Sequence, residues 1–415
     1  MKHGQDAYRV LLFAALFKKH HRRDCMKRFV SIFLALCIAA ASMTACSKTS
    51  STESQSASGS AGAAQSASQP VQEEEPYNAA LLTGLEKGAD YPEGRRFTAV
   101  MVNNISEGAT QQARPQAGLS DADILVEIKA EGGITRFMAL YENYETMPRV
   151  GPVRSARHQF FQLILPFHPM YVHVGESVVQ TEYKNNYDYS DFDLNGDVLS
   201  TLGHRDSDFR ARGVAIEHTY VTSGEEITKT IEQFGYDSSI DPYKSTFFDF
   251  VPYNEEPRVL TGGDASKISV VHSAGYKTYF DWDAEQGKYM MSQYSKAAGG
   301  VQPSVDANND EQLKFDNVIV LFTDIHVFPG HEAKDLQEVD YKFGGLGYYF
   351  NGGRVEPIRW QKGAADQVLR LVNDDAELTN VKVNPGRSYI AVVDLDEAEN
   401  FSYTAAAASA DSAAQ

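Results

Sequence analysis

Cysteine is scarce in this sequence. Its three cysteines, Cys25, Cys37 and Cys46, all lie within the first 46 of 415 residues. A chain processed at Cys46 would carry no second thiol, which excludes a disulfide, a thiolate zinc site and a cysteine nucleophile from its folded body. Long apolar runs are also missing, and a mean hydropathy of −0.37 excludes a polytopic membrane protein.

Basic residues are too few for a general nucleic-acid binder. The chain has 38 Lys and Arg against 56 Asp and Glu, a net charge of −18. Residues 1–45 hold eight of the bases and two of the acids, so the remainder carries −24. Neutralising phosphates requires an excess of Lys and Arg, so we expect no nucleic-acid partner for the mature chain. An acidic body is also repelled by anionic lipids, so membrane attachment would need an anchor.

The N-terminal region has the pattern of an export signal. Lys27 and Arg28 follow Met26 and precede a 13-residue apolar run, FVSIFLALCIAAA. A basic segment before a short apolar run is typical of a signal peptide and too short for a comfortable transmembrane helix. The run leads to Met-Thr-Ala-Cys46, which resembles the lipobox of bacterial lipoproteins, so we predict lipidation of Cys46. The alternative is a plain secretory signal cleaved nearby. We interpret Met26 as the start of translation.

Composition then divides the rest of the chain. A tract rich in Ser, Ala, Gln and Gly follows Cys46 and cannot bury enough surface to offset its ordering entropy. It predicts a flexible tether of roughly 30 Å. We predict a signal region over 1–45, the tether over 46–76, an N-terminal α/β domain over 77–250, a C-terminal β-rich domain over 262–400 and a disordered tail over 401–415.

The predicted fold class is α+β (mixed α/β), with a second domain that is predominantly β. Short apolar runs bounded by turn residues predict strands. In the first domain they cover 97–103, 124–129, 135–141 and 170–174; in the second, 268–271, 276–282, 288–293, 318–328, 341–350 and 388–393. Helices are predicted over 156–165, closed by Pro166, and from a Thr222/Glu225 capping box through Phe234. Residues 246–267 predict an interdomain connection.

An arginine-rich loop is the main candidate site. In RVGPVRSAR, Ser155 is placed to cap a helix that Arg154 and Arg157 flank, an arrangement that suits a phosphate or carboxylate. We predict an anion site there. Its members would be Glu127, Arg136, Arg154, Ser155, Arg157 and His173.

Long motifs resemble one known family. The pattern VNN, ARPQAGLSDADILVEI, EGGITRFMALY, VGPVRSAR and HVGES is similar to the YerB-like family of exported lipoproteins, as are FDNVIVLFTD and YYFNGGRVEPIRWQKG. The resemblance covers nearly all of residues 77–397. It implies a lipoprotein with two α+β domains of unknown function, and therefore no established activity.

Ordinary structural roles compete with the anion site. Arg136, Arg154 and Arg157 could pair internally with a carboxylate; the candidates are Asp121, Asp123, Glu127 and Glu131. Ser155 lacks the G-x-S-x-G elbow of a hydrolase nucleophile. A histidine on a strand, such as His173, is more often a hydrogen-bonded core residue than a catalytic base.

No cofactor is predicted beyond a weak calcium candidate. Residues 191–197, DFDLNGD, match the first half of an EF-hand loop, with possible ligands from Asp191, Asp193, Asn195 and Asp197. The twelfth position holds Leu202 instead of a bidentate Glu, so the ligand set is incomplete. The other histidines have no metalloprotease spacing.

The leading hypothesis is a lipid-anchored protein on the extracytoplasmic face of the cell membrane. Its body would bind a small-molecule or protein partner at the envelope. An anionic ligand would fit the arginine-rich loop, and a glycan or a peptide is the other possible partner. One alternative is a hydrolase or transferase acting on an envelope polymer, with Glu127, His173 or Glu176 as acid or base. The other is a structural assembly subunit without a small-molecule site. The sequence does not decide whether the protein is an enzyme.

Overall fold

A computed structural model describes residues 78–193, 199–240 and 246–405. The predicted signal and tether, and most of the predicted tail, lie outside these ranges. The dominant element is a ten-stranded mixed sheet with neighbours in the order β18-β17-β16-β13-β19-β2-β3-β1-β4-β5. In that order the strands are Arg370–Val372, Arg354–Gln361, Gly345–Asn351, Asn317–Thr323, Ser388–Asp394, Ile124–Lys129, Thr135–Tyr141, Thr98–Asn103, Met170–His173 and Phe192–Asp193.

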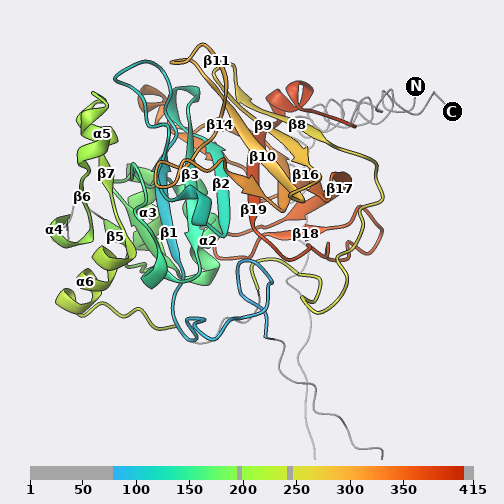
Figure 1. Cartoon of the computed structure of the whole chain (residues 1–415), viewed down its shortest axis with the longest axis horizontal. Coiled ribbons are helices and arrows are strands. Elements are labelled where there is room, and N and C mark those ends of the chain that lie inside the picture. The colour runs from blue at the N-terminus through green and yellow to red at the C-terminus, as the bar shows by residue number, and fades with distance from the viewer. Residues whose placement is uncertain (1–77, 194–198, 241–245, 406–415) are drawn as a thin grey trace, which may run out of the picture. The chain divides into compact units, whose positions relative to one another are not determined.

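A six-stranded sheet forms a second layer, in which β8 to β11 are drawn in yellow and orange in Figure 1. Its order is β11-β10-β9-β8-β20, and β12 pairs with β10. These strands are Gly300–Pro303, Lys288–Ser295, Tyr276–Asp283, Lys267–Ser273, Ser402–Thr404 and Lys314–Phe315. Two small two-stranded antiparallel sheets complete the strands: β6 (His204–Arg205) with β7 (Tyr220–Val221), and β14 (Ile325–Val327) with β15 (Gln337–Val339).

The helices of the described residues are short. They are α2 (His158–Ile164), α3 (Val178–Asn186), α4 (Leu199–Leu202), α5 (Ser207–Ala211) and α6 (Gly224–Phe234). Figure 1 shows α4, α5 and α6 beyond the β5 end of the large sheet. The described part of the chain is therefore rich in strands, and its α-helices all lie between His158 and Phe234.

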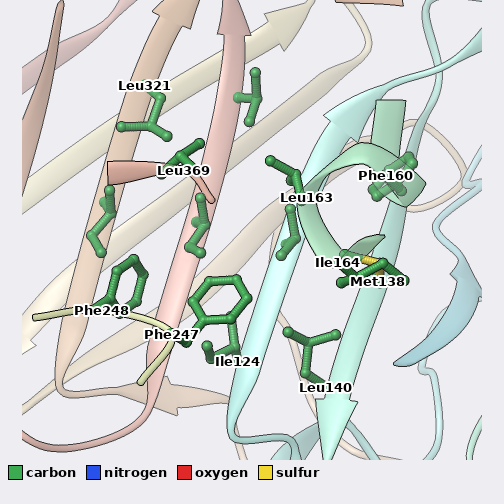
Figure 2. Packing of buried hydrophobic residues seen from close by; sticks show 14 of the residues in the cluster. Ile124, Met138, Leu140, Phe160, Leu163, Ile164, Phe247, Phe248, Leu321 and Leu369 are labelled. Carbon is green, nitrogen blue, oxygen red and sulfur yellow. The ribbon is translucent and has the colours of Figure 1, made fainter. Parts of the chain in front are cut away.

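The main core lies between the large sheet and α2 (Figure 2). Phe160, Leu163 and Ile164 of α2 pack on Ile124 and Met138, and all five are at most 3% exposed. Burying each such side chain contributes roughly 1.5–3 kcal/mol. On the other face, Phe280 of β9 lies 4.8 Å from the ring of Tyr389 on β19, so the six-stranded sheet covers that side.

Both predicted domains contribute strands to the large sheet. Strand β2, from the first, and β19, from the second, are parallel neighbours with Ile124 opposite Ser388. The described residues from Asn78 onward accordingly form one compact unit. The predicted domain boundaries thus divide the chain along its sequence. In space, hydrogen bonds between β2 and β19 join the two predicted domains in one sheet.

The segment predicted to connect the two domains contributes aromatic residues to the core. Phe247, Phe248 and Phe250 are 4–6% exposed, and Phe247 stacks on Phe167 at 5.1 Å. Figure 2 shows Phe247 and Phe248 directed at the sheet beside Ile124. Prolines and glycines make this segment irregular, but its aromatic residues hold it against the sheet by apolar burial.

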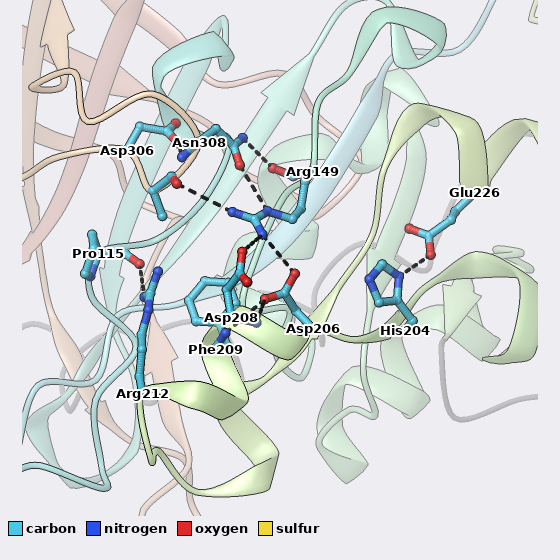
Figure 3. Close-up of polar contacts among 11 residues, drawn as sticks. Pro115, Arg149, His204, Asp206, Asp208, Phe209, Arg212, Glu226, Asp306 and Asn308 are labelled. Carbon is cyan, nitrogen blue, oxygen red and sulfur yellow. Dashed lines mark hydrogen bonds and ion pairs between the residues drawn. The ribbon is translucent and has the colours of Figure 1, made fainter.

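Arg149 also ties the two parts of the chain together (Figure 3). Its Nη1 lies 2.9 Å from the carboxylates of both Asp206 and Asp208, and its Nε donates to Asn308 at 3.1 Å. Asn308 donates in return to the Arg149 carbonyl oxygen at 2.9 Å. A single guanidinium thus bridges α5 and the loop after β11.

Three further details correct the predictions. The last segment begins as strand β20, paired with β8, instead of a disordered tail from 401, because Phe401 stacks on Tyr348 at 5.2 Å. The capping box lies one residue later than predicted, with Ser223 accepting from the Glu226 amide. Pro166 lies inside a 3₁₀ turn, Leu165–Phe167, after α2 ends at Ile164.

Candidate functional site

Most of the predicted site residues meet at one edge of the large sheet. Strands β1 and β4 are parallel, so their carboxyl ends lie together. The chain through Ala156 runs beside Glu176, just after β4, and these two residues form a parallel bridge. The carboxyl ends of parallel strands are where open sheets most often bind ligands. Arg154, Ser155 and Arg157 are thereby brought next to the end of β4.

Glu131 is the carboxylate at the centre of this edge. It opens a short 3₁₀ turn, Glu131–Gly133, between β2 and β3. Its Oε2 lies 3.0 Å from Nη2 of Arg157, and its Oε1 accepts a second bond from Nε of the same residue. Nη2 of Arg136 lies 3.4 Å from Oε2. The Nε and Nη2 side of the Arg157 guanidinium is therefore occupied by Glu131, and Nη1 donates to the Ala156 carbonyl oxygen at 2.7 Å.

The pKa values at this edge are shifted because several guanidinium groups lie around one carboxylate. Burial alone would raise the pKa of Glu131, but the hydrogen bond from Arg157 and the charge of Arg136 lower it. Burial, and then repulsion by Arg157, lower the pKa of Arg136 to about 9. The side chain of Arg136 is 5% exposed, and its Nε has no partner among the described residues. The group formed by Glu131, Arg136 and Arg157 therefore holds more positive than negative charge.

Arg154 is the least paired of the three arginines. The one hydrogen bond that its guanidinium makes among the described residues runs from Nη1 to the Glu217 carbonyl oxygen, at 3.4 Å. Burial lowers the pKa of Arg154, the Glu217 charge opposes that effect, and Arg157 repels it. No carboxylate oxygen lies within 4 Å of it in the described part of the chain. Partial exposure leaves this guanidinium open to solvent.

Ser155 does not cap the following helix, contrary to the prediction. Helix α2 starts at His158, its N-cap residue is Arg157, and no side chain caps it. The carbonyl oxygen of Ser155 instead accepts from Nη1 of Arg136. The predicted geometry fails because the chain stays extended through Arg157, where φ is −137° and ψ is 139°.

Glu127 lies apart from the arginine cluster. On β2 and β3, Glu127 is opposite Phe137 and Ile128 is opposite Arg136, so Glu127 and Arg136 point to opposite faces of the sheet. Glu127 is completely buried under the six-stranded sheet. It accepts hydrogen bonds from the hydroxyls of Thr135, Thr278 and Tyr389, at 2.6–2.8 Å. These bonds indicate a structural carboxylate.

His173 belongs to a neighbouring network of charges. Its Nδ1 lies 2.9 Å from the Gly175 carbonyl oxygen, and its Nε2 lies 2.9 Å from Oδ2 of Asp191. The ring is fully buried. Lys184 on α3 places its ammonium 3.0 Å from Glu176 and 2.9 Å from Asp191. His173 is thus a hydrogen-bonded core residue next to the arginines.

His173, Glu176 and Asp191 are also the possible metal ligands of the described residues. Their ligand atoms lie within 4.8 Å of one another. A metal ion would have to displace the Lys184 ammonium, which already bridges the two carboxylates. Of the predicted calcium ligands, Asp193 accepts from the Gly175 amide at 2.8 Å. Asn195 and Asp197 lie outside the described residues.

Several buried polar groups near this edge were not predicted. His158 is 1% exposed, and neither of its ring nitrogens has a partner among the described residues. Burial, with repulsion by Arg157, lowers its pKa to about 4. Gln180 is fully buried, and its amide is also unpartnered within the described ranges. A single histidine or glutamine in a sequence does not indicate a site, because both residue types are common on amphipathic helices.

Comparison with known proteins now places the chain. Residues 82–237 match the family described as "Protein of unknown function (DUF3048) N-terminal domain", and residues 268–390 match its C-terminal domain. The chain belongs to this family. It is 32% identical over 326 residues to "Putative lipoprotein YerB" of Bacillus subtilis, covering 77% of this chain and 87% of that protein.

A solved structure agrees with the fold of this DUF3048 protein. The crystal structure of YerB protein from Bacillus subtilis matches with a TM-score of 0.61 and 26% identity, over 79% of this chain and 99% of the other. The resemblance to the YerB-like family is therefore confirmed. Among the described residues, no helix is both long and apolar enough to cross a membrane.

Proposed function

We propose that this protein is exported, held at the outer face of the cell membrane by a lipid on Cys46, and binds an anionic ligand through Arg154. The export signal and the Ala-Cys46 junction support the anchor. The name of the Bacillus subtilis relative, which calls it a lipoprotein, agrees with it. A multiply acylated cysteine would hold the protein firmly, whereas one acyl chain binds membranes weakly.

The unequal pairing of the arginines carries the ligand proposal. Glu131 neutralises Arg157 and contacts Arg136, while Arg154 has one long bond to a carbonyl oxygen. Guanidinium groups that are partly desolvated favour an added anion, since each charge-assisted bond contributes roughly 1.5–3 kcal/mol. Arg154 would therefore contact the ligand, and Glu131 and Arg157 would position it.

The anchor is tested by replacing Cys46 with Ala. The variant should lose incorporation of labelled lipid and move from the membrane to the soluble fraction. A matched control is Cys37→Ala, within the apolar run, which should keep the lipid. Membrane-bound, lipidated Cys46→Ala protein would refute the anchor.

The anion site is tested with phosphate, sulfate and acetate in thermal melts of Arg154→Gln. Each of the first two should raise the melting temperature of the wild type, and Arg154→Gln should lose that effect while melting normally in anion-poor buffer. Arg370→Gln is the control, because the exposed guanidinium of Arg370 bonds only to Asn380 within the described ranges. A wild type unaffected by anions, with Arg154→Gln destabilised in their absence, would show a structural role.

The hydrolase alternative has less support. Two of its acid/base candidates, Glu127 and His173, are completely buried and hydrogen-bonded within the protein. General acid–base catalysis requires a group within reach of the substrate. Glu176 is the remaining candidate, with one oxygen bonded to Thr181 and close to Lys184.

A further inference from the structure

We propose that the outer face of the six-stranded sheet binds a neutral glycan in a hollow centred on Tyr279. The hollow has a volume of about 360 Å³ and lies across β8, β9, β10 and β20, with Val301 of β11 at its rim. It is formed by other elements than the arginine edge. The inference therefore goes beyond the anion-binding proposal and does not depend on it.

The hollow arises from one row of residues across the sheet. Strand register aligns Ser402, Ser269, Tyr279 and Ser292 on successive strands. Their neighbours along the strands, Ile268 and Phe280 among them, are buried against the large sheet, so this row faces outward. Three small serines around one large tyrosine leave unfilled space on both sides of the ring. The result is a trough walled by an aromatic side chain.

The polar groups of the trough are available. The hydroxyls of Ser269 and Ser402 make no hydrogen bond with any described residue, and both side chains reach solvent. Gln312 donates to Ser292 at 3.3 Å, a long bond that leaves its hydroxyl proton free. Serine hydroxyls both donate and accept, so they match a ligand that presents many hydroxyls.

The charges select a neutral ligand. The two charged residues of the trough, Lys267 and Asp281, lie opposite each other and form an ion pair, so they cancel. The rest of the chain after residue 45 carries −24, which repels polyanions. A sugar ring offers an apolar face for Tyr279 and hydroxyl or amide groups for the serines and the ion pair. Ligand sites commonly combine an aromatic surface with a few placed polar groups.

The test uses tetra-N-acetylchitotetraose as the probe, with the full folded body and saturation-transfer NMR titrations. The wild type should give a saturable signal. Tyr279→Ala should weaken binding about tenfold or more, as expected when a central aromatic contact is lost. Tyr294→Ala is the matched control, because Tyr294 lies on the same outer face of β10 but outside the trough. It should bind like the wild type.

A second variant covers the case in which Tyr279→Ala fails to fold. Ser269→Leu fills the trough while leaving the ring in place, and it should also abolish binding. No saturable signal for the wild type, or equal affinity in the wild type and both variants, would overturn the proposal. Binding of an unstructured peptide with the same dependence on Tyr279, and no sugar binding, would replace the glycan with a peptide. Arg154→Gln should leave sugar binding unchanged, so the two proposals can fail separately.

Discussion

Replacing Glu131 with Gln tests whether this carboxylate holds the arginine edge together. The substitution keeps the shape of the side chain but removes the charge that Arg157 and Arg136 share. Glu131 is 19% exposed and the partner side chains are 12% and 5% exposed, so solvent screens the pair only partly. Breaking a buried pair by removing one partner costs about 3–5 kcal/mol, because the other charge stays buried. We expect about 3 kcal/mol, since the amide oxygen still accepts a bond.

The assay is urea unfolding at pH 7 in low salt. Glu225→Gln is the control: its fully exposed pair with Lys229 should leave the free energy of unfolding unchanged. Adding sulfate should restore part of the stability of Glu131→Gln, because the uncompensated guanidinium groups can then bind an anion. A loss below about 1 kcal/mol would show that the arginines do not depend on Glu131, and the reasoning would fail.

The pH dependence of Glu131 follows from its lowered pKa. A carboxyl group with a folded pKa below its unfolded value stabilises the fold above the unfolded pKa, which is about 4.3 for Glu. That contribution disappears as the pH falls through the folded pKa. The wild type should therefore lose stability on acidification below about pH 5, and Glu131→Gln should lose less.

Three other outcomes are expected. Burial, against a hydrogen bond from Tyr91, raises the pKa of Glu142 to about 7, so its contribution is present below about pH 4 and lost as the pH rises through 7. Glu142→Gln should therefore unfold at higher urea than the wild type at pH 8, and equal midpoints would contradict this. Limited proteolysis should cut within 47–75 and leave a folded core; protection of that tract would show that it is ordered. Calorimetry on metal-stripped protein should detect no transition-metal site and at most weak calcium binding at Asp191–Asp197. Tight zinc binding would contradict this and would show that a metal can replace the Lys184 ammonium beside His173.

Strands in apolar runs were predictable. Strands β2 and β3 match the predicted bounds, because each is a short apolar run with a turn at both ends. Strand β17 was missed: it alternates charged and apolar residues, and its Pro357 argues against a strand. The proline is tolerated because β18 pairs only with Arg359–Gln361 and leaves that stretch of β17 open. Strand β20 was missed since its stability comes from Phe401 and Tyr403 packing on β16.

The partner of each arginine could not be predicted. Glu127 and Glu131 are both near Arg136 in sequence, but Glu127 lies within β2, where it is opposite Phe137 on the other face, whereas Glu131 lies in the 3₁₀ turn after β2. Both the register of β2 against β3 and the path of the turn that follows β2 are properties of the assembled sheet. The contacts of His173 likewise depend on Asp191, which comes just before β5, and on Lys184, which lies on α3.

Local patterns in the sequence thus determined the family resemblance, the strand-forming runs and the arginine-rich loop, because each depends on residues close together in the chain. The tertiary structure decided the rest. It joined the two predicted domains in one sheet through β2 and β19, and it placed Glu127 and Glu131 in separate environments. It also aligned serines from three strands around Tyr279. These outcomes depend on pairing between distant strands, whose free energy comes from burial and hydrogen bonding across the whole sheet.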